Sequence, residues 1–363
     1  MIKFFDLYKN DKKSHSTILR NIAKTLKKGD YILGAATQNF EKNFSTYVGS
    51  KYAVGCANGT DALILALKSL ELPKDSEVIL PAMSYCSTIF SIIHSNLKPV
   101  LVDIGDNSPT IDISKINNLI TKKTRVILPV HLYGSAININ LIRNKIRKYK
   151  QKIFIIDDCA QAHGALDDDN KIIGSSSDIS CFSLYPGKNL GAYGDAGIIT
   201  TNNKKFYKKI KNIRNLGSDK KFIHTNIGLN SRLDTIQSIV LNEKIKKLSV
   251  SNNKRKKIAK KYDQNIINKK LSKLNYSKNA VYHQYVIMVK NRNKLIKLLD
   301  KNKIQYGFHY PYALHQLHSL KKEYKNKRYP NSENLAKNGI SLPIDPLLTD
   351  FQIKFIIKTL NNF

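Results

Sequence analysis

The residue that first suggests chemistry is Lys188, in the segment "SLYPGKNLGAYGD" at residues 183–195. It lies between Gly187 and Asn189 and follows the apolar run "DISCFSLY", which is typical of a buried strand. Most lysines of this chain belong to solvated basic runs, so a lysine at the end of a buried strand stands out. An amine in that position can attack a carbonyl carbon and form a Schiff base.

A second group of reactive side chains follows the hydrophobic strand in "FIIDDCAQAHGA". Asp157 and Asp158 end this strand, and Gln161 and His163 follow in the next loop. Carboxylates at the carboxyl end of a parallel strand are expected at a functional site, but they could also cap the next helix. Both interpretations stay open at this point. For His163 we expect a hydrogen bond within the loop, with contact to a substrate as the alternative.

A third feature is "GCANGTDALILAL", in which Gly59 and Thr60 lie between a predicted strand and a predicted helix. Free backbone N–H groups and the helix dipole make such a helix start a site for anions. Because an ordinary N-cap threonine gives the same pattern, this feature alone does not establish a site.

The three features together match what pyridoxal phosphate requires of a protein. A lysine forms a Schiff base with the cofactor's aldehyde, an aspartate keeps the pyridine nitrogen protonated, and a helix start holds the phosphate. Lys188, Asp158 and the Gly59–Thr60 turn would supply these groups. The sequence therefore predicts pyridoxal phosphate as cofactor.

The segments that must position these residues alternate between β-rich runs and helical patterns from residue 52 to residue 201. This alternation predicts βαβ units and a mainly parallel sheet, with functional residues at the carboxyl ends of the strands. Helical patterns follow at residues 233–248 and 252–267, and a strand pattern at 280–289 precedes further helices. We predict an α/β fold with a large cofactor-binding domain at residues 1–245 and a small C-terminal α+β domain at 246–363.

The composition argues against several classes of protein. No stretch approaches the roughly 18 consecutive apolar residues of a membrane helix, and the first 16 residues lack the apolar core of a signal peptide, so we expect neither a membrane protein nor export. The four cysteines are scattered among apolar and small residues, which favours reduced thiols and a cytoplasmic location. The acidic run "LDDDN" is typical of a solvated turn, and we predict no metal site.

The formal net charge of +34 raises a different functional hypothesis, a basic regulator that binds nucleic acid. The excess is nearly all lysine, in segments such as "KKFYKKIKNIR" and "KRKKIAKKY", which suit the solvated faces of amphipathic helices. No zinc-finger, helix-turn-helix or ribonucleoprotein motif accompanies the charge, so we expect no nucleic-acid partner.

The chain resembles the DegT/StrS sugar aminotransferases, which have the type I, aspartate-aminotransferase-like fold. The resemblance covers nearly the whole chain and rests on a series of motifs in the family's order: "YILGAATQNFEKNF", "GCANGTDALILAL", "LPAMSYCSTIFSI", "PVHLYG", "DDCAQAHGA", "CFSLYPGKNLGAYGDAG", "GLNSRLDTIQS", "FHYPYALH" and "LPIDPLLT". It implies a pyridoxal phosphate-dependent aminotransferase that forms a homodimer with shared active sites.

The resemblance also implies roles for single residues. Lys188 matches the Schiff-base lysine, and Asp158 matches the partner of the pyridine nitrogen. The other residues implied to contact the cofactor are Tyr85 on the ring face, Gln161 near the 3-hydroxyl group, and Gly59, Thr60, Ser183 and the neighbouring subunit's counterpart of Asn230 at the phosphate. The residues expected on the sugar-nucleotide side are Arg232, His309 and Tyr310. His163 and Tyr185 are further substrate candidates, with a loop hydrogen bond for His163 and packing for Tyr185 as the alternative roles.

The reaction implied is the transfer of an amino group from L-glutamate to a nucleotide-linked keto sugar. Lys188 would serve twice, because the lysine released from its Schiff base can then move the proton. The segments "YPGKNLGAYGDAG" and "GLNSRLD" look more like those of family members that aminate C3 of nucleotide-linked 3-keto-6-deoxyhexoses than like those of members that aminate C4. We therefore expect a dTDP-3-amino-3,6-dideoxyhexose as product, for surface polysaccharide or glycan biosynthesis. A UDP-linked 3-keto or 4-keto sugar is the alternative substrate.

Overall fold

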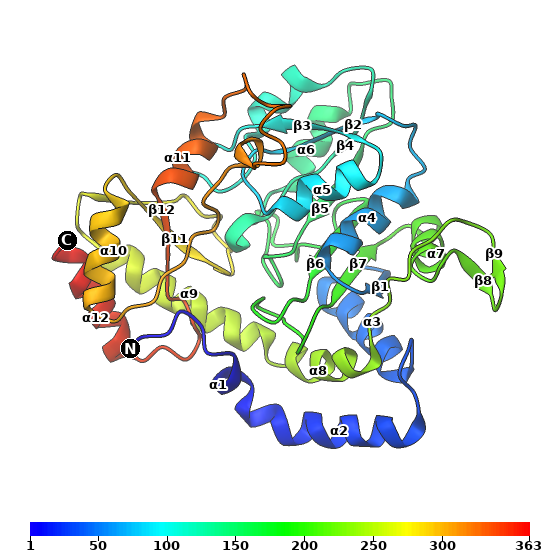
Figure 1. Cartoon of the computed structure of the whole chain (residues 1–363), viewed down its shortest axis with the longest axis horizontal. Coiled ribbons are helices and arrows are strands. Elements are labelled where there is room, and N and C mark those ends of the chain that lie inside the picture. The colour runs from blue at the N-terminus through cyan, green and yellow to red at the C-terminus, as the bar shows by residue number, and fades with distance from the viewer.

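The computed structural model describes residues 1–363 and is built around a seven-stranded sheet. The strand order is β1-β7-β6-β5-β4-β2-β3 (Figure 1). The strands are β1 (Tyr52–Cys56), β2 (Glu77–Pro81), β3 (Lys98–Val102), β4 (Thr124–Ile127), β5 (Phe154–Asp158), β6 (Ile179–Ser183) and β7 (Gly197–Thr201). Neighbours are parallel from β6 to β3, whereas β7 is antiparallel to both β1 and β6. The predicted α/β fold with a mainly parallel sheet is confirmed.

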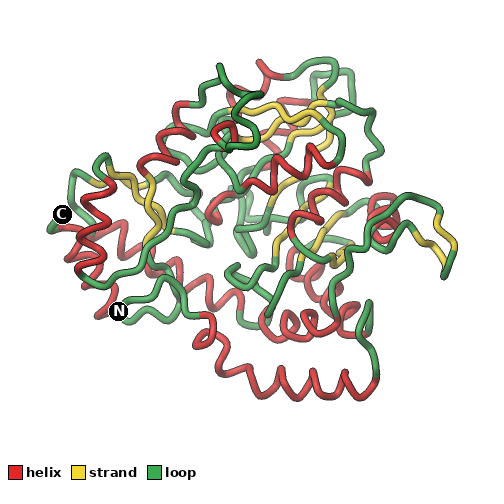
Figure 2. The backbone as a smooth tube through the Cα atoms, in the orientation of Figure 1, coloured by secondary structure: helices red, strands yellow, loops and turns green.

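Helices cover both faces of this sheet, as the backbone tube in Figure 2 also shows. One face carries α4 (Gly59–Ser69), α5 (Cys86–His94) and α7 (Lys204–Ile213). The other carries α3 (Ala35–Val48), α6 (Ile139–Ile146) and α8 (Thr235–Ile245), with the 3-10 helices η2 (Ile113–Leu119) and η3 (Leu132–Gly134) in the connections. Since both faces are covered, strands such as β2 and β7 are buried along their whole length.

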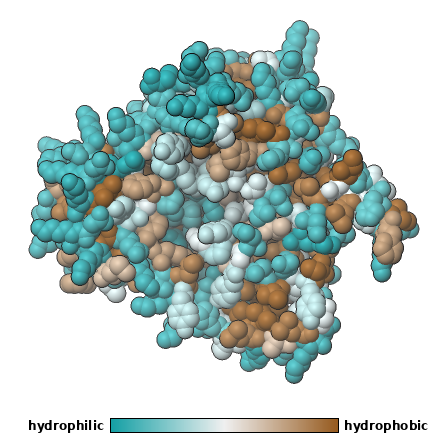
Figure 3. All heavy atoms as spheres, viewed as in Figure 1, coloured by the Kyte–Doolittle hydropathy of each residue, from teal (hydrophilic) through white to brown (hydrophobic).

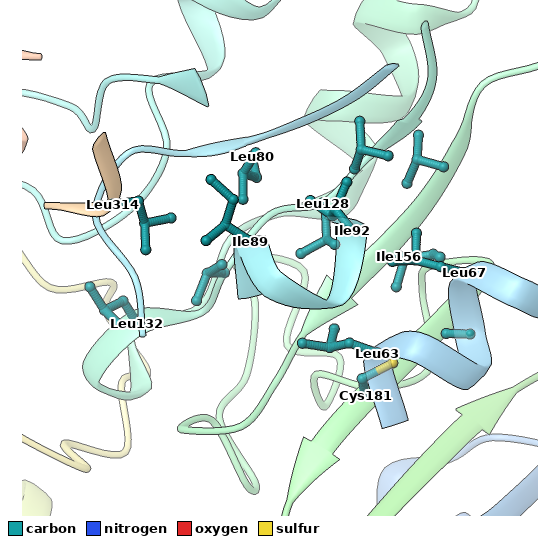
Figure 4. Packing of buried hydrophobic residues seen from close by; sticks show 14 of the residues in the cluster. Leu63, Leu67, Leu80, Ile89, Ile92, Leu128, Leu132, Ile156, Cys181 and Leu314 are labelled. Carbon is teal, nitrogen blue, oxygen red and sulfur yellow. The ribbon is translucent and has the colours of Figure 1, made fainter. Parts of the chain in front are cut away.

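The packing on the two faces fixes which way each residue of β5 points. Figure 4 shows Ile156 among leucine and isoleucine side chains of α4 and α5. Ile155 belongs to a separate cluster with Ile142 of α6. Because side chains alternate along a strand, Asp157 must lie on the face of Ile155, and Asp158 on the face of Ile156.

The C-terminal part of the chain has a second, antiparallel sheet of order β10-β11-β12, formed by β10 (Leu271–Lys273), β11 (Tyr285–Val289) and β12 (Gly339–Leu342). Around it lie α9 (Leu248–Asn265), α10 (Arg292–Lys301), α11 (Pro330–Asn338) and α12 (Asp350–Asn361), whereas η4 (Leu314–Gln316) packs against the large domain through Leu314. Ile2 packs into the hydrophobic cluster of this part and bridges Ile304. The two sheets agree with the predicted fold, and the domain boundary at residue 245 remains a prediction.

The sequence analysis did not predict the N-terminal helices α1 (Leu7–Asp11) and α2 (His15–Lys28), which are joined by the 3-10 helix η1 (Lys12–Ser14). Ile18 is the one buried residue of α2, whereas Leu19 and Leu26 are exposed, and hydrophobic surface is visible near this helix in Figure 3. The hairpin of β8 (Ser218–Lys220) and β9 (Ile223–His224) projects from the body of the molecule in Figure 1. None of the helices combines the length and the hydropathy that crossing a membrane requires.

Candidate active site

Asp158 ends β5 on the sheet face that α5 covers. Its carboxylate accepts a hydrogen bond from the Thr88 hydroxyl at 2.9 Å and one from the Ala160 N–H at 3.0 Å. Burial raises the pKa of Asp158, although these two donors and the nearby Lys188 oppose the rise. An ionised carboxylate can accept about four hydrogen bonds. Asp158 therefore keeps acceptor capacity for a further partner.

Asp157, its neighbour, is buried on the other face of the sheet, where its hydrogen-bond partners are other side chains of the protein. Its carboxylate accepts hydrogen bonds from His131 Nε2 at 3.1 Å and from the Ser177 hydroxyl at 2.5 Å. Burial alone would raise the pKa of Asp157, but these donors outweigh it and lower the pKa. The thiol of Cys159 lies beside the pair, yet His131 has both ring nitrogens in hydrogen bonds, the second with the Ile137 N–H at 3.0 Å. This cluster therefore offers no free imidazole nitrogen to a metal ion.

Lys188 follows β6 in a tight turn, in which its N–H donates to the Tyr185 carbonyl at 2.9 Å. The chain folds back so closely that a Cβ at Gly191 would lie 2.4 Å from the Pro186 carbonyl oxygen, so only glycine fits there. The Lys188 amine forms neither a hydrogen bond nor an ion pair with the rest of the chain. Burial lowers the pKa of Lys188 to about 8, against the opposing effect of Asp158. A useful share of this amine is therefore neutral near physiological pH.

The residues predicted to bind the phosphate meet where α4 starts beside the end of β6. Asn58 caps the helix by accepting a hydrogen bond from the Asp61 N–H at 2.8 Å, which leaves the first backbone N–H groups of α4 free. Gly59 lies so close to Ser183 that a Cβ at residue 59 would be 2.5 Å from the serine Cβ. Thr60 donates its hydroxyl hydrogen to Ser87 at 2.8 Å. Gly59, Thr60 and Ser183 are thus brought together at one helix N-terminus.

Gln161 is held in one orientation by two partners. Its Oε1 accepts a hydrogen bond from the Tyr133 N–H at 2.7 Å, and its Nε2 donates to the Tyr310 hydroxyl at 2.8 Å. The Tyr310 ring in turn contacts Tyr85, with ring centroids 5.3 Å apart. Tyr133 also donates its hydroxyl hydrogen to the His309 carbonyl. This network brings Tyr85, Gln161, His309 and Tyr310 into one cluster, and their contacts with cofactor and substrate remain predictions.

Three histidines lie near Lys188 and are kept neutral by their surroundings. Burial and the positive charge of Lys188 lower the pKa of His163 to about 3 and that of His309 to about 4, and they lower the pKa of His283 as well. His309 Nδ1 bonds the Ser341 hydroxyl at 2.8 Å. The ring nitrogens of His163 have no hydrogen-bond partner, and its ring packs on Phe182 at 5.4 Å. The hydrogen bond expected for His163 within its own loop is thus not formed.

Three predicted residues stand apart from this cluster. Asn230 is exposed, and its backbone pairs with Asn215. Arg232 donates to the Asn215 side chain at 3.1 Å. Between them, Ser231 accepts a hydrogen bond from the Ala57 N–H at 3.2 Å, so this loop touches the chain next to the cup. Tyr185 is 56% exposed and packs in no core cluster.

The sequence analysis missed several residues that the structure places here. Thr88 and Ser84, linked at 2.7 Å, orient Asp158, and both lie in the motif "LPAMSYCSTIFSI". Tyr133 lies in "PVHLYG", and His283 bonds Asn189 of the lysine loop at 3.2 Å. Ser84, Thr88 and Tyr133 lie in motifs that the sequence analysis already lists, so these motifs could have pointed to them. His283 lies in an apolar strand pattern that gave no such signal.

Comparison with known proteins links this arrangement to one family. The model of the DegT/DnrJ/EryC1/StrS aminotransferase family matches residues 12–361. A dTDP-3-amino-3,6-dideoxy-alpha-D-galactopyranose transaminase of Aneurinibacillus thermoaerophilus is 37% identical over 100% of this chain and 99% of its own length. A UDP-N-acetyl-3-dehydro-alpha-D-glucosamine 3-aminotransferase of Acidithiobacillus ferrooxidans is 34% identical over 93% of this chain and 90% of its own length.

The structural comparison agrees with the sequence comparison. The crystal structure of DesV from S. venezuelae, in complex with a ketimine intermediate, matches with a TM-score of 0.96 at 32% identity. The match covers 99% of this chain and 98% of that chain. The fold around Lys188 and Asp158 is thus that of a known group of aminotransferase structures.

Proposed function

Because the chain belongs to the DegT/DnrJ/EryC1/StrS family and is a pyridoxal phosphate-dependent aminotransferase, we propose that it aminates C3 of a nucleotide-linked keto sugar. The observation that carries this proposal is the partly buried Lys188, whose amine has a pKa lowered to about 8 by desolvation and no partner within the chain. A lysine held in this state is suited to react with a carbonyl and to move a proton.

The residues present fit pyridoxal phosphate. The free N–H groups at the start of α4 and the Ser183 hydroxyl form a cradle for a phosphate, and a Cβ at Gly59 would fill part of it. The buried carboxylate of Asp158 has spare acceptor capacity for a pyridine N–H. Tyr85 presents an aromatic ring that is 54% exposed. When bound, the cofactor supplies an aldehyde that takes up amino groups and a ring that withdraws electrons from the neighbouring carbon.

In this proposal each residue of the chain has a separate task. Lys188 binds the aldehyde and, when free, holds the proton that moves between substrate and cofactor. Asp158, oriented by Thr88, holds the proton on the ring nitrogen. Gln161 donates its remaining N–H to the 3-hydroxyl oxygen, because Tyr133 fixes its amide orientation. Tyr85 packs on the ring face and helps to exclude water.

For the sugar substrate we favour a dTDP-linked 3-keto-6-deoxyhexose, converted to the 3-amino-3,6-dideoxyhexose. The printed activity of the Aneurinibacillus relative supports this choice, since it matches over the whole chain. The Acidithiobacillus relative supports a UDP-linked 3-keto sugar as the second candidate. We assign His163, Tyr185, Arg232, His309 and Tyr310 to the substrate side of the site. L-glutamate is the proposed donor, and surface glycan biosynthesis is the proposed use of the product.

We place the reaction in the cytoplasm and in a homodimer. The four cysteines are all unpaired, as expected in a reducing compartment. Asn230 is exposed beside the projecting hairpin, where Phe222 is 83% exposed, so this loop is free to reach a second copy of the chain. We propose that Asn230 contacts the phosphate bound by the other subunit.

Subunit mixing tests the shared site. Lys188→Ala and Asn230→Ala subunits are each expected to be inactive as homodimers. In a mixed dimer, one site carries both changes and the other carries neither, so activity should return. If subunit exchange is demonstrated and no activity returns, Asn230 does not act across the dimer.

The proposed reaction is tested directly with purified protein, glutamate and a panel of dTDP- and UDP-linked 3-keto and 4-keto sugars. We expect 2-oxoglutarate and an amino sugar from the dTDP-linked 3-keto-6-deoxyhexose, identified by mass spectrometry. Lys188→Ala should abolish turnover, whereas Lys74→Ala, a change at an exposed lysine, should not. Turnover of 4-keto sugars alone would contradict amination at C3, and preference for the UDP-linked sugar would favour the second candidate.

A further inference from the structure

A small cavity lies behind the lysine loop, lined by three segments of the chain and by Pro346. Its volume is about 60 Å³. The three segments are residues 5–14 at the N-terminus, Pro186, Lys188 and Asn189 of the lysine loop, and residues 244–255, which run from the end of α8 into α9. A water occupies about 30 Å³ in the liquid, so the cavity has room for about two waters or one small anionic group.

Arg255 is the most unusual residue of this cavity. It is only 4% exposed, and its one hydrogen bond runs from Nη1 to the Ile344 carbonyl at 2.9 Å. The buried Nε–H has no partner. The face of the guanidinium packs on the Phe5 ring at 5.2 Å. Since a guanidinium has five N–H donors, most of its donors remain free in a place where unpaired donors are costly.

The nearest acidic group does not satisfy this arginine. The Asp345 carboxylate acts on Arg255 electrostatically, but its oxygens accept hydrogen bonds from the Asp6 and Leu347 N–H groups and from the Asn10 side chain. No hydrogen bond joins Asp345 to the guanidinium. The Arg255 guanidinium thus lies in the protein with no anion that accepts hydrogen bonds from its free N–H groups.

Two lysines add positive charge to the same walls. Lys244 pairs with Asp11 at 2.7 Å, and Lys247 donates to the Ser14 hydroxyl at 2.6 Å. Asp11 is the only acidic side chain among the lining residues, against Lys188, Lys244, Lys247 and Arg255. Once the Lys244–Asp11 pair and Lys188, the proposed Schiff-base lysine, are set aside, Lys247 and Arg255 leave an excess of two positive charges.

We propose that this cavity binds a small oxyanion, held by Arg255 and Lys247. Resting on the proposed function, we assign the oxyanion to the side-chain carboxylate of a dicarboxylic amino donor. The reason is that Lys188 and Asn189 line the same cavity as Lys247 and Arg255. An amino donor whose amine is at Lys188 would therefore direct its side-chain carboxylate toward these two basic residues. This assignment predicts that a dicarboxylate such as glutamate is a better amino donor than a monocarboxylic amino acid.

Binding of glutarate to the cofactor-loaded enzyme tests this site without any reaction, because glutarate has no amine. Isothermal titration calorimetry compares wild type with Lys247→Gln and with Lys246→Gln. Lys246 is the matched control, since its side chain is 62% exposed and pairs with Glu243 outside the cavity. We expect Lys247→Gln to weaken glutarate about tenfold, the loss typical of one charge-assisted hydrogen bond. Lys246→Gln should leave the affinity unchanged, and equal affinity in both variants overturns the proposal.

Further measurements separate the outcomes. Arg255→Lys keeps the positive charge but removes the several N–H donors of the guanidinium, so it should weaken glutarate binding even where the melting temperature is unchanged. If this variant does not fold, the affinity of Lys247→Gln alone decides. The KM for glutamate should rise in Lys247→Gln while kcat stays the same, which a purely structural role would not produce. Inorganic phosphate is the second probe: weaker phosphate binding with unchanged glutarate binding would overturn the assignment to the donor. Because glutarate binding needs no turnover, inactivity toward every keto sugar would contradict the proposed function and leave this site standing.

Discussion

Removing the amine of Lys188 should stabilise the cofactor-free protein below pH 8. Burial lowers the pKa of this amine from 10.5 to about 8, and a pKa difference of one corresponds to about 1.4 kcal/mol. The buried charge therefore costs the fold about 3 kcal/mol at neutral pH. Lys188→Met keeps the length and the apolar part of the side chain but removes the charge, so it should recover most of this free energy.

The sign of the pH dependence follows from which state holds the proton. Below pH 8 the amine is protonated in both the folded and the unfolded chain, and the folded state bears the full cost. Between pH 8 and 10.5 the folded chain releases its proton first, so the unfolded chain binds more protons and the stability of the wild type rises with pH. Above pH 10.5 neither state is charged. The advantage of Lys188→Met should thus be largest below pH 8 and vanish above pH 10.5.

Thermal melting of the cofactor-free proteins from pH 6.5 to 10.5 provides the assay. At about 2.1 cal/mol/K per residue, a chain of 363 residues has an unfolding entropy of about 0.8 kcal/mol/K, so about 3 kcal/mol shifts the melting temperature by about 4 °C. Lys74→Met, at an exposed lysine, is the control and should show no such pH-dependent difference. A Lys188→Met advantage that is absent or independent of pH would refute the reasoning, because the amine would then not be desolvated.

Three further changes separate chemistry from stability. Asp158→Asn should lower the transamination rate by an order of magnitude or more with little effect on the melting temperature. Asp157→Asn should instead lower the free energy of unfolding by about 3 kcal/mol or more, because it breaks the buried pair with His131. Measurement of kcat and of the melting temperature of both variants tests this. Gly59→Ala places a Cβ 2.5 Å from that of Ser183, so it should cost about 1–3 kcal/mol and weaken the cofactor in an absorbance titration. Glu41→Gln removes the carboxylate that pairs with the buried Arg214 guanidinium at 2.5 Å, so the melting temperature should fall. An unchanged melting temperature would show that this ion pair does not stabilise the fold.

The parts of the site that the sequence could predict are those that local patterns fix. Hydrophobic runs mark β5 and β6, so Asp158 and Ser183 could be placed at strand ends, and the structure has both there. Gly59 could be placed at a helix start because a strand pattern precedes it and a helical pattern follows. In a mainly parallel sheet these ends meet at one edge, which explains why residues far apart in the chain could be expected together.

What could not be predicted depends on packing between distant segments. The choice between Asp157 and Asp158 depends on which face each presents, and adjacent apolar residues on both faces of β5 hide the alternation. His283 reaches Asn189 across 94 residues of sequence. The helix α2 buries only Ile18, so its pattern gives no sign of the surface it packs on. The proposed contact of Asn230 with a second subunit would involve another chain, which the packing of a single chain does not test.

The surroundings of Lys188 also limit what can control its protonation. His163 and His309 have pKa values of about 3 and 4, and burial likewise lowers the pKa of His283, so no imidazole in this cluster titrates near neutral pH. The charge state of Lys188 in the cofactor-free protein therefore depends on burial and on Asp158 alone. The same desolvation that keeps the histidines neutral lowers the lysine pKa, so Lys188 can exchange a proton near pH 8 while the three imidazoles stay neutral. This separation explains how a chain with a net charge of +34 can keep a lysine ready to react as a neutral amine.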